Sequence, residues 1–211
     1  MRIALLGATG GTGLSFLEQA LGNGHTIKAL ARTPENLTIN HPNLVIQAGN
    51  VFTVSSLTSL MQDTDVVVSV FGISGIWQAR KPRGLYSIGG TNVIKAMQET
   101  GHKRLLAVTS SGVEPQPNDG FFFKYIFKPL FLEKMYEDMR ILEKNILTSN
   151  LDYTIVRPPY LTDGPLTGQY RISATGNFAD DKDLSRADLA HFLLHETEQS
   201  GYIRKTVALS Y

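Results

Sequence analysis

The sequence contains no cysteine, a single tryptophan and almost no excess charge of either sign. The absence of cysteine excludes disulfides, thiolate zinc sites, iron–sulfur clusters and a cysteine nucleophile. Its 20 lysine and arginine residues nearly balance its 19 aspartate and glutamate residues. The net charge of +1 therefore gives no electrostatic reason to expect nucleic acid as a partner.

Long apolar runs are also absent, since no stretch reaches the roughly 18 residues that a membrane-spanning helix needs. Because the sequence runs straight into a strand-like segment, we expect no signal or transit peptide. We therefore expect a cytoplasmic protein with no stable membrane insertion. With 211 residues, of which 42% are hydrophobic and 18% charged, the chain can form a substantial core and does not have a disordered composition.

Short apolar runs rich in branched residues alternate with helical patterns along the chain. Most of the runs are apolar on both faces, as buried parallel strands are. The expected strands lie at residues 3–6, 27–30, 44–46, 66–70, 105–108, 153–156 and 206–209. The expected helices lie at residues 14–21, 55–61, 87–99, 133–147 and 185–196.

This alternation predicts an α/β fold of the Rossmann type, with a doubly wound, mostly parallel sheet and helices on both faces. We expect one domain over residues 1–211, with substrate-site loops around 73–86, 114–132 and 158–180. The last helix opens with Ser-Arg-Ala-Asp, which predicts a capping box in which Asp188 takes the acidic role.

A glycine-rich turn, Gly-Ala-Thr-Gly-Gly-Thr-Gly, occupies residues 7–13, directly after the first strand and before the first helix. Gly7 would allow a sharp turn, Gly10 a close approach of the backbone to a pyrophosphate, and Gly13 close packing of the helix on the strand. The helix N-terminus would then offer free N–H groups to phosphate. The turn predicts a dinucleotide site, with a tight turn that binds no ligand as the alternative.

The end of the second strand bears on which dinucleotide is bound. An NAD site would place an aspartate or glutamate there to bind the ribose hydroxyls, whereas this chain has Arg32. A guanidinium suits the 2′-phosphate of NADP, which it can bind through two parallel hydrogen bonds. The alternative is an exposed surface arginine. Arg32 therefore favours NADP(H) over NAD(H) as the cofactor.

Four motifs in order along the chain resemble known sequences. The glycine-rich turn, Arg32 and Thr-Ser-Ser-Gly at 109–112 resemble atypical short-chain dehydrogenase/reductases of the NAD(P)-binding, NmrA-like type. Residues 157–170, with Asp-x-Pro-Leu-Thr-Gly-x-Tyr after a double proline, resemble the subgroup of biliverdin-IXβ reductase and flavin reductase. Residues 150–158 and 184–190 are typical of the wider family.

This resemblance implies a set of site residues. The implied cofactor-binding residues are Gly7, Thr9, Gly10, Gly11, Thr12, Gly13, Arg32, Asn50, Val51, Phe71, Gly72, Thr109, Ser110, Pro158 and Pro159. It implies catalytic roles for Ser110, which would orient the carboxamide or polarise the acceptor, and for Tyr160, which would pack beside the acceptor ring or pass a proton. The family often has aspartate where this chain has Asn50. Ligands of open α/β sheets bind at the carboxyl ends of strands, where these residues are expected.

The Tyr-x-x-x-Lys pair of ordinary short-chain dehydrogenases is missing, because Tyr136 is followed by Arg140 and Tyr153 by Arg157. Arginine does not deprotonate in proteins and places its charge differently from lysine. Tyr136 and Arg140 could still form a variant pair, or could support the fold. Hydride transfer to an electron-poor conjugated ring needs no such pair, since the protein mainly aligns two flat rings and a proton can follow from solvent.

Two further segments are unusual in composition. Residues 121–131 contain six aromatic side chains, which could form a lid or pocket wall, a core or dimer surface, or a patch that touches membranes. Arg80-Lys81-Pro82-Arg83 could draw in an anionic substrate or could be a solvated basic loop, and Trp77 beside it could cover the pocket or merely pack.

His191 and His195 are four residues apart on one expected helix, but no His-Glu-x-x-His motif accompanies them. We therefore expect an ordinary helix surface and no metal. Ser110 lacks the Gly-x-Ser-x-Gly context of a hydrolase nucleophile, which disfavours esterase chemistry.

The leading hypothesis is an NADPH-dependent reductase that transfers hydride to a flavin or a similar conjugated acceptor, so that flavin is a candidate substrate. The alternatives are a non-catalytic NADP-binding sensor or regulator of the NmrA-like type and, more weakly, an epimerase or dehydratase, which usually needs a longer C-terminal substrate domain. We expect a small-molecule substrate and a monomer or weak homodimer.

Overall fold

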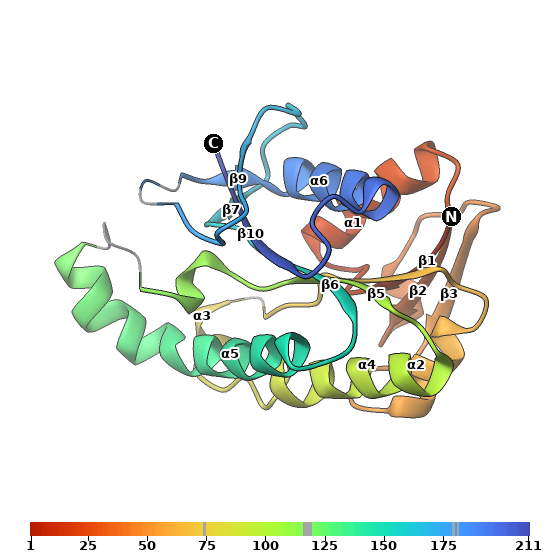
Figure 1. Ribbon diagram of the computed structural model, residues 1–211, viewed down its shortest axis with the longest axis horizontal. Helices are drawn as coiled ribbons and strands as arrows, with labels where there is room; N and C mark the ends of the chain where they lie inside the picture. Colours follow the sequence, from red (N-terminus) through yellow and green to blue (C-terminus); the bar gives the residue numbers. More distant parts are fainter. Residues whose placement is uncertain (74, 116–119, 179, 181) are drawn as a thin grey trace.

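The computed structural model describes all residues except 74, 116–119, 179 and 181. Its main sheet has eight strands in the order β3-β2-β1-β4-β5-β6-β10-β8 (Figure 1). The strands are β1 (Arg2–Leu6), β2 (Thr26–Ala31), β3 (Leu44–Ala48), β4 (Val66–Ser69), β5 (Arg104–Val108), β6 (Asp152–Arg157), β8 (Arg171–Ser173) and β10 (Lys205–Ser210). All neighbours pair in parallel except β8, which runs antiparallel to β10. The prediction of a mostly parallel, doubly wound sheet is confirmed.

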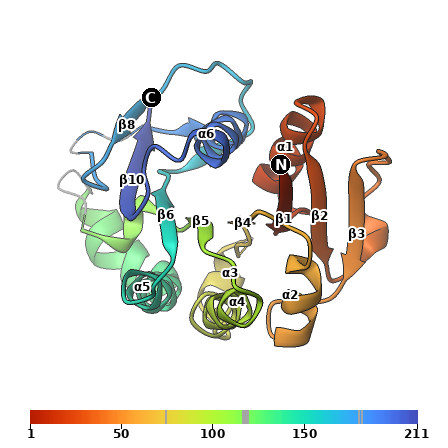
Figure 2. The same cartoon turned by 45° about the vertical axis from the view of Figure 1, so that its right-hand side comes forward.

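Helices cover both faces of this sheet (Figure 2). The two helices on one face are α1 (Gly11–Gly22) and α6 (Arg186–Gln199). The three on the other are α2 (Val54–Met61), α4 (Ser87–Thr100) and α5 (Glu133–Leu147). Alternate residues of β1 enter different cores: Ile3 and Leu5 pack with α1 and α6, and Ala4 and Leu6 with the opposite helices. This alternation explains why the strand is apolar along its whole length.

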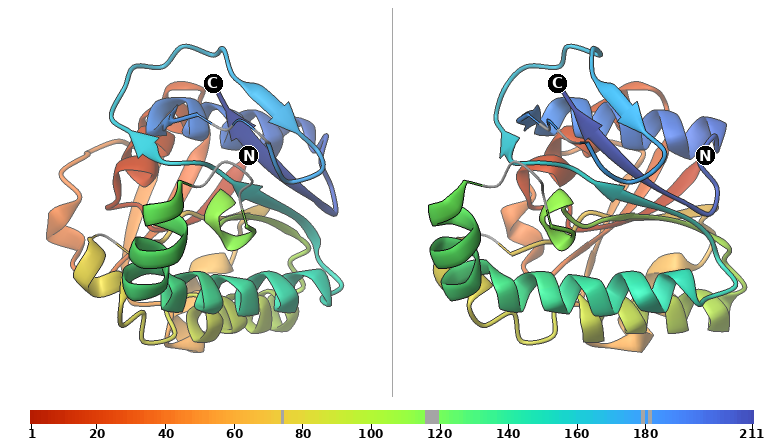
Figure 3. Two further views of the ribbon diagram at one scale, coloured as in Figure 1. Left: turned by 90° about the vertical axis from the view of Figure 1, so that its left-hand side faces the viewer. Right: turned by 60° about the vertical axis from the view of Figure 1, so that its left-hand side comes forward.

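Short elements complete the chain. They are η1 (Pro34–Asn36), α3 (Ile76–Ala79), η2 (Ser111–Val113), the π-helix η3 (Phe123–Leu132), and the two-residue strands β7 (Leu161–Thr162) and β9 (Leu184–Ser185), which pair with each other. Both α3 and η3 lie at the same end of the molecule (Figure 3). In the part of the chain that is described, no helix combines the length and the apolar character needed to cross a bilayer.

The start of α6 differs from the predicted capping box. The Ser185 hydroxyl accepts a hydrogen bond from the Asp188 N–H at 2.9 Å, as predicted for an N-cap. The acidic half of the prediction is wrong, because the buried Asp188 carboxylate turns to the 158–180 loop. It accepts from the Thr167 and Gly168 N–H groups of that loop, both at 2.8 Å, and from the hydroxyl of the C-terminal Tyr211 at 2.6 Å. Burial alone would raise the pKa of Asp188, but these donors outweigh it and lower that pKa.

Candidate cofactor site

The turn between β1 and α1 is shaped by backbone contacts that leave no room for side chains. Gly7 has φ +93°, and a Cβ there would lie 2.5 Å from the backbone nitrogen of Phe71, which follows β4. A Cβ on Gly13 would overlap the Gly7 carbonyl oxygen and lie 2.8 Å from the Ala8 Cα. The turn therefore forms a narrow cradle between β1 and β4, where the strand order reverses and ligands of doubly wound sheets bind.

The first turn of α1 can receive an anion at this cradle. Gly10 is the N-cap, and no side chain caps the helix. Its carbonyl accepts from Leu14 at 2.9 Å, so the helix starts directly at the turn. The early N–H groups of an α-helix have no partner within the helix and carry its positive dipole end. The predicted dinucleotide turn thus has the geometry that a pyrophosphate needs.

A residue that the motif analysis missed, Arg186, lies against this turn. A Cβ on Gly11 would meet the Arg186 Cδ at 2.6 Å and Nε at 3.1 Å. The Arg186 guanidinium donates to the Asp163 carboxylate at 2.6 Å, and the Asp163 side chain is 90% exposed. Arg186 lies in the 184–190 segment that is typical of the wider family, and this is the one signal of the site that the sequence carries; the Ser-Arg-Ala-Asp pattern itself predicts only a helix cap. A guanidinium therefore borders the phosphate cradle.

The ends of β2 and β3 bring the other predicted cofactor residues to the same edge. Arg32 directly follows β2 and is exposed. The Gly49 N–H donates to the Ala31 carbonyl at 3.0 Å, which holds the turn after β3 beside it. The Asn50 side chain accepts from the Phe52 N–H at 2.9 Å and thus shapes this turn.

The segment after β4 is anchored by a buried tyrosine. The rings of Phe71 and Tyr86 have centroids 6.0 Å apart, and the Tyr86 hydroxyl accepts from the Ile73 N–H at 3.3 Å. Burial raises the pKa of Tyr86 to about 12, so it stays neutral. The Tyr86 N–H in turn donates to Asp138 at 2.8 Å. Phe71 and Gly72 are thereby held next to the glycine cradle.

The ends of β5 and β6 are joined by backbone hydrogen bonds. The Thr109 N–H donates to the Val156 carbonyl and the Ser111 N–H to the Pro158 carbonyl, both at 2.9 Å. Ser110, between them, accepts from the Gly112 N–H at 3.2 Å and is half-buried. The structure therefore places Ser110 and Pro158 at the joined ends of the two strands.

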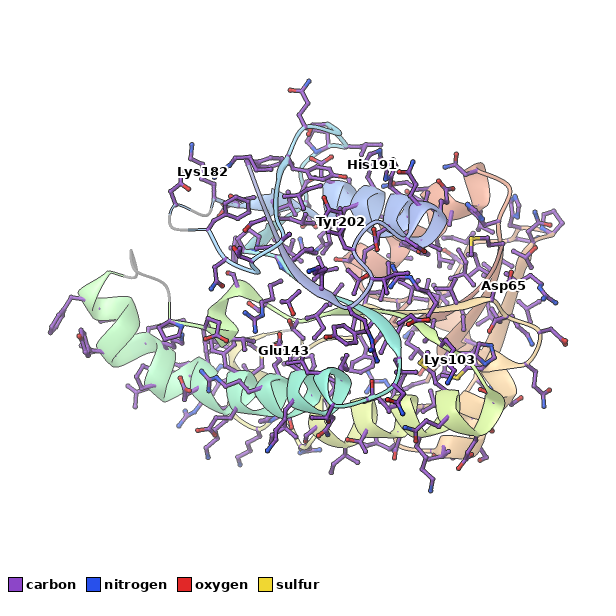
Figure 4. All side chains as sticks on the ribbon, in the orientation of Figure 1. Asp65, Lys103, Glu143, Lys182, His191 and Tyr202 are labelled. Carbon is purple, nitrogen blue, oxygen red and sulfur yellow. The ribbon has the colours of Figure 1, made fainter. Side chains whose placement is uncertain are left out.

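A buried ionic network lies beneath this pair of strand ends. Glu143 lies on α5 (Figure 4). Its carboxylate accepts from the Arg157 guanidinium at 2.6 Å and from the Thr109 hydroxyl at 2.6 Å. Burial alone would lower the pKa of Arg157, but Glu143 and then Glu114 reverse the effect and raise it. The Thr109 side chain thus points to Glu143 on α5, whereas its backbone N–H bonds to β6.

Tyr160 extends the double proline outward. Pro158 is buried and Pro159 half-buried, whereas the Tyr160 ring is 76% exposed. The backbone carbonyl of Tyr160 accepts from the Leu184 N–H at 3.0 Å, which fixes the backbone of Tyr160 beside β7 and β9. The structure therefore gives Tyr160 a fixed backbone and an aromatic face open to a ligand.

The variant pair Tyr136 and Arg140 is split between different contacts. Tyr136 is buried, and the Lys128 ammonium lies 5.1 Å from its ring centroid. Arg140 donates instead to the Val113 carbonyl at 2.9 Å and to Glu133 at 2.8 Å. Sequence spacing did not reveal Lys128 as a neighbour of Tyr136, because η3 brings it there from outside α5.

The two histidines on α6, His191 and His195, contact each other, and His191 also contacts Tyr170. His191 Nδ1 lies 2.9 Å from the Tyr170 hydroxyl, and the rings of His191 and His195 stack with centroids 6.3 Å apart (Figure 4). Among the described residues, no group of three or more metal-binding side chains is placed to hold an ion.

Most of the described part of the aromatic segment lies at the molecular surface. Phe121, Phe122 and Tyr125 are 76%, 65% and 59% exposed, which argues against a place in the core. Phe131 instead packs toward α3, where the Arg80 guanidinium lies 5.5 Å from its ring centroid. The pocket-wall, dimer-surface and membrane interpretations stay open.

Residues 7–200 match the profile of the family described as NAD(P)H-binding. The matched part begins at the first glycine of the turn and extends through α6. The chain belongs to this NAD(P)H-binding family. The NAD(P)-binding part of the resemblance is therefore confirmed, while the NmrA-like type and the biliverdin-IXβ and flavin reductase subgroup stay predictions.

Relatives and solved structures agree with this assignment. The chain is similar to the photosystem II assembly factor Ycf39 of Synechocystis, with 24% identity over 98% of this chain, which spans 61% of that protein's length. It also resembles the structure of ChuY, an anaerobillin reductase from Escherichia coli O157:H7, with 23% identity, a TM-score of 0.81 and coverage of 100% and 97% of the two chains. A third similar structure is a short-chain dehydrogenase/reductase from Veillonella parvula in complex with NADP, at 17% identity, a TM-score of 0.81 and coverage of 100% and 94%. At these identities, the two solved structures establish the shared fold.

Proposed function

We propose that this protein is an NADPH-dependent reductase that transfers hydride to a flavin or a similar conjugated acceptor. One observation carries the proposal: among the described residues, α5 presents no exposed Tyr-Lys pair to the edge with the glycine cradle, and the lysine near Tyr136, Lys128, faces the ring of that buried side chain. Tyr136 is only 7% exposed and Arg140 is bound elsewhere. A carbinol or ketone substrate needs a positioned acid or base, whereas a conjugated ring needs mainly alignment.

The residues of the edge fit the cofactor. Gly7 and Gly13 leave the space, α1 supplies amide donors, and Arg186 adds a positive charge beside Gly11. Arg32 would bind the 2′-phosphate, since it is exposed and no carboxylate of a described residue lies within 4 Å of it. The Veillonella protein, which has a similar fold, was solved in complex with NADP, and this supports a cofactor that carries the 2′-phosphate.

The acceptor would lie over the ends of β5 and β6. When bound, NADPH supplies the hydride. The Ser110 hydroxyl would orient the carboxamide or the acceptor, and the exposed Tyr160 ring would pack against the acceptor. The proton would come from solvent. The description of ChuY as an anaerobillin reductase supports reductase chemistry on this fold.

Anaerobic oxidation of NADPH in the presence of FMN, riboflavin or a quinone tests the proposal. We expect turnover with at least one of these acceptors, weaker turnover with NADH, and a severalfold lower kcat for Ser110→Ala. Tight NADP(H) binding with no turnover of any acceptor would overturn the reductase and favour the sensor. Turnover of a sugar nucleotide instead would favour the epimerase or dehydratase.

A further inference from the structure

We propose that Arg80 and Lys134 form an anion site that binds the acidic group, a carboxylate or a phosphate, of the acceptor. Arg80 follows α3, in the connection from β4 to α4, and Lys134 lies in the first turn of α5. The identity of the ligand as an acceptor rests on the proposed function. The anion site itself rests on the contacts of these two side chains.

The Arg80 guanidinium is positioned by two aromatic rings. Its Cζ lies 5.6 Å from the centroid of the Trp77 ring and 5.5 Å from that of Phe131. Contacts with ring faces hold a guanidinium through cation–π attraction and leave its N–H edge available. That edge is the part of arginine that binds a carboxylate or phosphate through parallel hydrogen bonds. Trp77 therefore has a role that its 75% exposure alone does not suggest.

A small cavity separates the two cations. It has a volume of about 70 Å³ and is lined by Arg80, Pro129, Leu130, Phe131 and Lys134. This volume exceeds the roughly 10–15 Å³ that one water molecule needs, so the cavity has room for a small anionic group. The other three lining residues carry no charged side chain, so Arg80 and Lys134 are the charged groups with which an anion would pair there.

Of the acids near Lys134 on α5, Glu133 and Asp138 have other partners, and the exposed Glu137 forms no ion pair with Lys134 within 4 Å. Glu133 accepts from Arg140 at 2.8 Å, and Asp138 accepts from the backbone of Tyr86 at 2.8 Å and from the Ser87 hydroxyl. Across the described residues, neither Arg80 nor Lys134 has a carboxylate within 4 Å. Two cations that face one cavity without a counter-charge repel each other, and a bound anion would remove that repulsion.

The place of the cavity suits an acceptor rather than the cofactor phosphates. The segment that carries Arg80 begins at Phe71, next to the Gly7 turn, and α3 and η3 lie side by side at that end of the molecule (Figure 3). In the proposed function, Arg32 and Arg186 are the cations assigned to the cofactor. An acidic substituent of an acceptor at the strand ends would therefore reach Arg80 and Lys134.

A comparison of FMN with riboflavin tests the site, because the two flavins share the reacting ring and differ in the phosphate. We expect the ratio of the FMN KM to the riboflavin KM to rise about tenfold in Arg80→Gln and about threefold in Lys134→Gln. Lys81→Gln removes the same charge next to Arg80 and serves as the matched control, with a ratio within about twofold of the unmodified protein. An unchanged ratio in Arg80→Gln, or an equal rise in Lys81→Gln, would overturn the proposal.

A second measurement does not depend on turnover, since Trp77 is the only tryptophan of the chain. Its fluorescence should change saturably when inorganic phosphate is added at constant ionic strength. We expect this change in the unmodified protein and in Lys81→Gln, and its loss in Arg80→Gln. No saturable change in the unmodified protein would overturn the anion site. A saturable change without reduction of either flavin would instead overturn only the proposed reductase.

Discussion

The edge at the carboxyl ends of the strands has two parts that are built in different ways. The cofactor half is the glycine turn between β1 and α1, and the acceptor half is the proposed acceptor site, with Ser110, Tyr160 and the segment around Trp77. At the cofactor half, backbone atoms approach so closely that only glycine fits, as at Gly7 and Gly13. At the acceptor half, the groups that would meet a ligand are exposed side chains, with Tyr160 76% and Trp77 75% exposed. At the cofactor half, close backbone contacts therefore restrict these positions to glycine. At the acceptor half, the exposed side chains can be substituted without a steric clash. One fold can in this way keep a cofactor while its acceptor changes.

The largest expected effect is at the cofactor half. Gly13→Val should weaken NADPH binding by at least about a hundredfold and lower the free energy of unfolding by about 3 kcal/mol, because the new side chain overlaps the Gly7 carbonyl. Isothermal titration with NADPH and urea unfolding measure the two effects. Gly22→Ala is the control, since nothing lies within 4 Å of its Cβ. Normal NADPH binding by Gly13→Val would contradict the cradle.

The next effect concerns the support below the acceptor half. Glu143→Leu should lower the free energy of unfolding by about 3 kcal/mol, because it leaves the buried Arg157 guanidinium without its main partner. Urea unfolding of this variant and of the double variant Glu143→Leu, Arg157→Leu measures the coupling. The double variant should be more stable than Glu143→Leu alone. Equal free energies of unfolding for the unmodified protein, Glu143→Leu and the double variant would show that the Glu143–Arg157 ion pair does not stabilise the strand ends.

Asp188 provides a pH-dependent test of the loop that carries Tyr160. Since its folded-state pKa is lowered, its contribution to stability is complete above the unfolded pKa of about 4 and is lost as the pH falls through the folded pKa. Asp188→Asn should therefore cost about 2 kcal/mol at pH 7 and progressively less below about pH 4. Urea unfolding across this range checks the trend. A cost that does not change with pH would refute the hydrogen-bonded carboxylate.

The smallest effect is on cofactor choice. Arg32→Gln should weaken NADPH binding about tenfold and leave NADH binding nearly unchanged, because only NADPH carries the 2′-phosphate. Titration of both dinucleotides measures the ratio of their dissociation constants. Equal weakening of the two would assign Arg32 to the fold rather than to the phosphate.

Sequence patterns predicted the cofactor half far better than the acceptor half. Glycines forced by close backbone contact and helices with a regular apolar face leave local signals, and the predicted helix 133–147 coincides with α5. Contacts between distant segments leave none. The spacing of Asp188 suited a helix cap, but its partners come from the 158–180 loop and the C-terminus, and Arg186 reaches Gly11 only because α6 packs on α1.

The acceptor half also contains elements without a sequence signal. The strands β7 and β9 have two residues each, and η3 is a π-helix that lies at the molecular surface, with Tyr125 exposed and Phe127 and Phe131 half-buried. Such segments are positioned by the elements that they touch. For the same reason, the pairing of Lys128 with the Tyr136 ring could not be predicted from the spacing on α5.

The most direct test of the account is an anaerobic single turnover in which NADPH carries deuterium at the transferred position of its nicotinamide ring. The account predicts that FMN is reduced in step with NADPH oxidation, that deuterium slows the reduction, and that Gly13→Val abolishes it while Gly22→Ala does not. Reduction at the same rate with either isotope would show that hydride transfer does not limit the observed step. Bound NADPH that leaves FMN oxidised would contradict the central claim that this edge aligns a dinucleotide with a conjugated acceptor.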